Sequence, residues 1–111
     1  MSAPRRGEIW LADLDPTADN EVAGQRPVLV MSSDAFHNWP IHLAIVVPLT
    51  TSSRPLRHHT PVVSGGLDRP SVARPEDVRS ITTRRFTRRL GVADPSSVET
   101  VADSLRDFLE L

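Results

Sequence analysis

The chain has 111 residues, no cysteine and a net charge of -1; this size fits one domain, 1–111, and a charge near zero argues against a strongly electrostatic nucleic-acid binder. Without cysteine, disulfides and thiolate metal sites are excluded. No apolar run approaches the roughly 18 residues of a membrane span, and the first residues lack a hydrophobic signal region, so we expect a cytoplasmic protein.

The first half of the chain predicts three strands. Glu8 to Leu14 alternates apolar and polar residues, and turn formers at 15–20 then begin a long loop. Pro27 to Ser33 and Ile41 to Leu49 are β-branched and apolar on both faces, which is typical of central strands. Asp34 to Pro40 connects these two strands.

The second half predicts shorter strands and a closing helix. Strand candidates are Thr60 to Ser64, Ser71 to Arg74 and Val78 to Thr82, and the prolines among them favour edge positions. Asp94 can cap a helix that has Pro95 at its first position, and a capping box of Ser96 with Glu99 is an alternative start. Helical spacing places one apolar stripe on the sheet: Val98, Val101, Leu105, Phe108 and Leu109. The fold class is mostly β with a C-terminal α-helix.

Charges are distributed unevenly along the chain. Residues 54–89 hold nine arginines against three acids, whereas residues 90–111 hold five acids against one arginine. All basic residues are arginines, whose planar donors suit phosphate and base stacking. The cluster Arg84, Arg85, Arg88 and Arg89 is therefore either a nucleic-acid contact or a solvated turn paired with the acidic terminal helix.

Arg26 is the first candidate site residue. It lies between a polar loop, 21–25, and Pro27, and a second apolar run ends in a hydroxyl at Thr50. If the two strands are antiparallel neighbours, the guanidinium and the hydroxyl meet, and together they could hold a phosphodiester and stabilise its transition state. The alternative is an ordinary loop arginine paired with a carboxylate.

Four segments occur in the order and spacing of a known family: 6–17 (RGEIWLADLDPT), 21–30 (EVAGQRPVLV), 48–50 (PLT) and 76–81 (EDVRSI). Over essentially its whole length the chain resembles the MazF/PemK (Kid) toxins. The resemblance implies a small SH3-like barrel that forms a two-fold homodimer, with single-stranded RNA along the dimer interface. It also implies a metal-independent endoribonuclease without cofactors, held inactive by a cognate MazE-like antitoxin.

The resemblance also implies roles for single residues. Arg26 matches the arginine at the scissile phosphate, and Thr50 matches the threonine that hydrogen-bonds a phosphate oxygen. The RNA's own 2′-hydroxyl would be the nucleophile. Glu21 matches an acid that orients the arginine or contacts RNA. We favour an electrostatic role for Arg26, because arginine stays protonated.

The sequence offers two candidates for the general base. In the PemK branch an arginine and a carboxylate match Arg74 and Glu76, but Glu replaces the branch's Asp, and Asn20 stands where that branch has a histidine. Glu76 is the first candidate base and Asp77 the second. Pairing of Glu76 with Arg74 or Arg79 is the structural alternative.

Other polar and aromatic residues complete the expected RNA surface. Trp39 is a candidate for base stacking, whereas Trp10 on its strand is expected in the core. Further RNA contacts are expected at Gln25, Arg74, Asp77, Arg79, Arg84 and Arg85.

We expect no metal site. Neighbouring residues of a strand point to opposite faces, and this argues against a metal shared by His58 and His59.

Two other functions stay open. A CcdB-type toxin uses a similar barrel to grip a protein, DNA gyrase, without cleaving anything. A catalytically decayed RNA binder is the third possibility, because Asn20 and Val22 depart from the family pattern. By resemblance, the antitoxin should lay an acidic and hydrophobic disordered tail along the arginine-lined groove.

Overall fold

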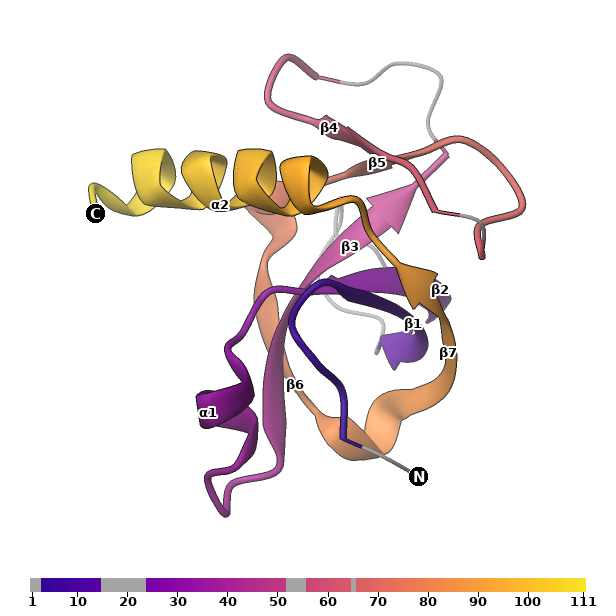
Figure 1. Cartoon of the computed structure of the whole chain (residues 1–111), viewed down its shortest axis with the longest axis vertical. Helices are drawn as coiled ribbons and strands as arrows, with labels where there is room; N and C mark the ends of the chain where they lie inside the picture. The colour runs from indigo at the N-terminus through magenta and orange to yellow at the C-terminus, as the bar shows by residue number, and fades with distance from the viewer. Residues whose placement is uncertain (1–2, 15–23, 52–55, 65) are drawn as a thin grey trace.

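A computed structural model describes residues 3–14, 24–51, 56–64 and 66–111 (Figure 1). Asn20, Glu21 and Val22 lie outside the described residues, as does most of the expected first loop. The strands are β1 (Glu8–Leu14), β2 (Gly24–Val30), β3 (Leu43–Thr50), β4 (Thr60–Val62), β5 (Ser71–Ala73), β6 (Arg79–Thr82) and β7 (Phe86–Val92). The helices are α1 (Asp34–His37) and α2 (Pro95–Leu109), with 3₁₀ turns η1 (Pro75–Asp77) and η2 (Thr83–Arg85).

The strands form one antiparallel sheet in the order β4-β5-β3-β2-β1-β7. β1 pairs with β2 on one edge and with β7 on the other. β3 pairs with β2 on one edge, whereas its other edge pairs first with β6 and then, at its end, with β5. β3 thus connects the strands of the first part of the chain, through β2, with β5 and β6 from its second part.

Two apolar cores lie on the two faces of the sheet, because side chains alternate along each strand. One core contains Ile9 and Leu29 and extends to Val98 and Val101 of α2. The other contains Trp10 and is formed by strand residues with Phe86. Figure 1 shows α2 lying beside β4 and β5, with α1 at the opposite end of the molecule. The mostly β fold with a C-terminal helix is as predicted.

Most strand predictions are confirmed, with shifted ends. β1 has the predicted bounds and Trp10 is buried. The central strands begin or end up to three residues from the predicted positions. A solvated turn was the expected alternative around Arg88, and β7 was missed. β7 is an edge strand of mostly exposed residues, so its sequence lacks the alternation of apolar and polar residues by which a strand is predicted. It is a strand because it pairs with β1.

Helix α2 begins as predicted, after Asp94 and with Pro95 at its first position. The Asp94 carboxylate does not cap the backbone and instead accepts a hydrogen bond from the Ser96 hydroxyl at 2.6 Å. The prediction that the whole stripe packs on the sheet was wrong for the last turn, where Phe108 and Leu109 are 46% and 62% exposed. The Phe108 ring instead lies edge-on to His58, in the turn before β4, with ring centroids 5.5 Å apart. Among the described residues, no helix combines the length and the apolar character needed to cross a bilayer.

Candidate functional site

Arg26 and Thr50 lie near the ends of neighbouring strands. Arg26 is on β2, opposite Ala12 of β1, and its side chain is exposed. β2 and β3 are antiparallel, and Val28 is opposite Pro48. Arg26 and Thr50 are each two residues beyond that pair, so the alternation of side chains puts both on the same face of the sheet. Thr50 is half-buried and pairs with Val72 of β5 on its other side.

A cleft of about 310 Å³ includes Arg26 and Pro27 in its lining. Leu11 of β1 and Arg88 of β7 form its neighbouring wall, and the connection from β4 to β5 contributes Asp68 and Arg69. The hydroxyl residue in this lining is Thr51, whereas Thr50 is not part of it. Within the described part of the chain, the lining therefore presents three guanidinium groups and one carboxylate.

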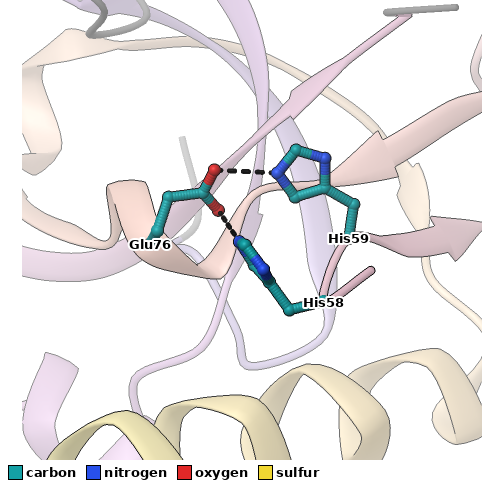
Figure 2. Close-up of side chains that lie close together, drawn as sticks. All are labelled: His58, His59 and Glu76. Atoms are coloured by element: carbon teal, nitrogen blue, oxygen red, sulfur yellow. Dashed lines mark hydrogen bonds and ion pairs between the residues drawn. The ribbon is translucent and has the colours of Figure 1, made fainter. Parts of the chain in front are cut away.

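Glu76 lies in a separate cluster with His58 and His59 (Figure 2). His58 Nε2 is 3.0 Å from one carboxylate oxygen and His59 Nε2 is 2.7 Å from the other. Arg74 Nε lies 3.5 Å from the second oxygen, so the alternative pairing with Arg74 is also present. The expectation that the two histidines face opposite ways was wrong, because they lie in and just after a turn before β4 rather than within a strand.

The hydrogen bonds of His59 determine which of its two ring nitrogens carries the proton. The backbone N–H of Leu56 donates to His59 Nδ1 at 2.9 Å, so Nε2 carries the proton and donates to Glu76. Three potential ligand atoms of this cluster lie within 4.8 Å of one another. A metal on His59 Nε2 would need the proton on Nδ1, where the Leu56 N–H already points. The arrangement thus fits a carboxylate that holds two histidines better than it fits a metal.

The Glu76 carboxyl is shifted toward its ionised form. Burial alone would raise its pKa, but hydrogen bonds from His59 and from its own backbone N–H bring the pKa below the ordinary 4.5. A carboxylate held in this way is a weak base by itself. It can, however, orient His58, whose side chain is 33% exposed. Sequence reasoning missed both histidines as partners of Glu76.

Arg26 and the Glu76 cluster lie on opposite edges of β3. Pro48 of β3 pairs with Val28 of β2, while its carbonyl accepts a hydrogen bond from the Arg74 backbone N–H at 3.0 Å. Val28 and Arg74 are therefore two strand spacings apart, about 10 Å. Thr50 stands at the end of the strand between them.

Several other predicted site residues hold the fold together. Asp77 pairs with Arg79 at 3.0 Å, and both side chains are mostly buried, which ties η1 to β6. Arg85 donates to the Asp13 carbonyl and so ties η2 to β1.

The remaining predicted residues are exposed on different parts of the surface. Gln25 is exposed on β2, and Arg84 is exposed on η2. Trp39 is 58% exposed after α1, with its ring 5.3 Å from that of Phe36. None of these three residues is among the described residues that line the cleft.

Known proteins resemble this chain along nearly all of its length. Endoribonuclease MazF9 of Mycobacterium tuberculosis is 32% identical over 114 residues, covering 96% of this chain and 97% of the relative. The crystal structure of MazF from Deinococcus radiodurans has a TM-score of 0.88 at 23% identity and covers both chains completely. An endoribonuclease from a mycobacterial species, in complex with its cognate antitoxin, has a TM-score of 0.78 at 22% identity and covers 98% of this chain and 97% of that one.

The family match is equally extensive. Residues 5–109 match the PemK-like, MazF-like toxins of type II toxin-antitoxin systems. The match includes the cleft with Arg26 and the cluster around Glu76. This chain belongs to that toxin family.

Proposed function

We propose that this toxin cleaves single-stranded RNA at selected sequences without a metal ion, and that it thereby inhibits translation and growth. The observation that carries the proposal is the cleft that combines Arg26 with two further arginines. Family membership and the relative named as an endoribonuclease support the same activity. Since its substrate would be translated RNA, we also propose that the protein acts in the cytoplasm.

The reaction needs charge stabilisation and two proton transfers. The 2′-oxygen attacks the adjacent phosphorus, and its proton passes to a base. The bond from phosphorus to the 5′-oxygen then breaks, and the leaving oxygen takes up a proton. The products are a 2′,3′-cyclic phosphate and a 5′-hydroxyl end. In this scheme Arg26 stabilises the charge that develops on the phosphate oxygens, and Thr50 donates a hydrogen bond to one of them.

Glu76 is our candidate for the proton transfer, acting together with His58. The carboxylate lies 3.0 Å from His58 Nε2, and an imidazole oriented by a carboxylate is a suitable base near neutral pH. Arg74 lies beside Pro48, on the edge of β3 away from Arg26. This position supports a site in which groups on both edges of β3 contact the phosphodiester.

We further propose that a cognate antitoxin of the MazE type inhibits the enzyme by occupying the same arginine-lined cleft. The family is defined by toxin-antitoxin pairing. An acidic disordered tail would complement the three guanidinium groups of the cleft, at the cost of becoming ordered. RNA and such a tail should therefore compete for the protein.

The test is incubation of purified protein with a long single-stranded RNA in excess EDTA, followed by sequencing of the new ends. Cuts at a short shared sequence with 5′-hydroxyl ends are expected from the wild type. Arg26→Ala should lower kcat by roughly 10² to 10³-fold, and Thr50→Ala should also lower it, because each removes a donor to the transition state. Arg106→Ala on α2 serves as the control that removes an arginine elsewhere.

If the folded wild type leaves diverse RNAs intact, the nuclease proposal fails. A protein target of the kind that CcdB-type toxins bind would then be sought by pull-down. Loss of activity in Arg106→Ala to the same extent as in Arg26→Ala would also contradict the assigned roles.

A further inference from the structure

We infer that Arg69 and Arg88 form a second phosphate-binding position in the cleft of Arg26. It holds a phosphate that neighbours the scissile one on the same RNA strand. The inference rests on RNA as the proposed substrate and deepens that proposal. Three features carry it: the spacing of the walls, the fixed position of the loop that bears Arg69, and the chemistry of the lining.

The first feature is the register of three strands. Leu11 of β1 lies opposite Pro27 of β2 and also opposite Arg88 of β7. Pro27 and Arg88 are therefore two strand spacings apart, about 10 Å, with Leu11 between them. The lining of the cleft contains both Arg26, the residue before Pro27, and Arg88.

The second feature is the close packing of the connection from β4 to β5 against β7. A Cβ atom at Gly66 would lie 1.6 Å from the Leu90 carbonyl oxygen, and one at Gly91 would lie 2.5 Å from Ser64 Oγ. Only glycine allows this approach of the two backbones. In addition, the Ser71 hydroxyl donates to the Arg69 carbonyl at 3.1 Å. The backbone that carries Arg69 is thus held beside the strand that carries Arg88.

The third feature is the chemistry of the lining. Among the described residues that line the cleft, Arg26, Arg69 and Arg88 are exposed arginines, and Asp68 carries the one carboxylate. The next arginine, Arg89, is not part of this lining and pairs with Glu8 at 2.8 Å. Guanidinium forks match phosphate oxygens two at a time. The cleft therefore offers more positive charge than one scissile phosphate requires.

The lining also favours a nucleotide over an acidic peptide segment. Leu11 and Leu90 give the cleft apolar surface between its arginines. A nucleotide strand presents flat apolar base faces and a phosphate on every residue, so it matches both kinds of lining at once. A volume of about 310 Å³ is at the small end for ligand sites, which suits one nucleotide unit of a longer strand.

The experiment compares Arg69→Gln and Arg88→Gln with Arg106→Gln, which removes the same charge from α2. KM and kcat are measured on a long RNA cut by the wild type, and equilibrium binding is measured by filter retention of single-stranded DNA of the same sequence. That DNA lacks the attacking 2′-hydroxyl. Each cleft variant should raise KM about tenfold with kcat within about twofold, because a charged hydrogen bond to substrate is lost. The salt slope of log K should become shallower by about 0.7 per arginine.

The outcomes separate this inference from the proposed function. Cleavage by the wild type with unchanged KM and salt slope in both cleft variants overturns the second phosphate position and leaves the nuclease intact. If the wild type binds RNA without cutting it, and this binding depends on Arg69 and Arg88, the nuclease proposal fails and the second phosphate-binding position is supported. If the variants lose affinity for an acidic peptide of about 15 residues but keep their affinity for nucleic acid, the position belongs to an antitoxin tail and the inference is wrong. Thermal unfolding of each variant checks that it is folded.

Discussion

At the scale of single residues, Glu76 predicts how the protein responds to acid. The pKa of Glu76 lies below the ordinary 4.5 in the folded state. Ionised Glu76 therefore stabilises the fold at pH values above the pKa that Glu76 has in the unfolded chain. This stabilisation is lost as the pH falls through the lower, folded-state pKa. Glu76→Gln should therefore be less stable than the wild type at pH 7, and the difference in unfolding free energy should shrink below pH 4.5.

Urea unfolding at a series of pH values measures this difference. Glu110→Gln, at the exposed end of α2, is the matched control and should run parallel to the wild type. A difference between Glu76→Gln and the wild type that stays constant down to about pH 3 would show that the contacts of this side chain with the two histidines do not depend on the charge of Glu76.

The sequence could predict some of these residues but not others. Arg26 and Thr50 could be placed near each other because each directly adjoins a strongly apolar strand, and antiparallel pairing of those strands fixes the rest. The contact of His58 and His59 with Glu76 could not be predicted, because it depends on a turn before β4 that returns the chain to η1. Arg88 was noticed only as part of a basic cluster, since its role depends on the neighbouring strand.

At the scale of elements, the approach of the β4–β5 connection to β7 depends on Gly66. Gly66→Ala should destabilise the protein by about 1–3 kcal/mol, because its methyl group would clash with the Leu90 carbonyl and the backbone must move. The displaced loop should also raise KM for RNA, since Arg69 would move relative to Arg88. Denaturant unfolding and the RNA assay measure the two effects.

Val63→Ala is the control for that prediction, because Val63 follows β4 and is 74% exposed. It should change the unfolding free energy by less than about 0.5 kcal/mol. A Gly66→Ala variant as stable as the Val63→Ala variant would contradict the close packing.

The elements differ in how well their local sequence specifies them. β1 and the start of α2 were predicted correctly, because alternation and a proline at the first helical position are local patterns. β7 was missed because Arg88 and Arg89 interrupt any apolar alternation, and its strand geometry comes from hydrogen bonds to β1. α1 is only four residues long, too short for a helical period to appear in the sequence.

At the scale of the whole molecule, we expect the two-fold dimer that the family resemblance implies. Large apolar side chains remain exposed in the single chain, among them Trp39, Ile41, Phe108 and Leu111. Contact between two copies would cover part of this surface. Light scattering should give twice the chain mass of 12.3 kDa over a range of concentrations. A mass of one chain at every concentration would contradict the dimer.

The pairing of β1 with both β2 and β7 has a consequence for synthesis of the protein. β2 ends at Val30 and β7 begins at Phe86, so at roughly 5–20 residues per second a ribosome needs on the order of 3 to 11 seconds to make the chain between them. A nascent chain that stops before Arg88 lacks one wall of the cleft. The growing toxin therefore cannot complete its cleft until the ribosome has translated the codon for Arg88, late in its own message.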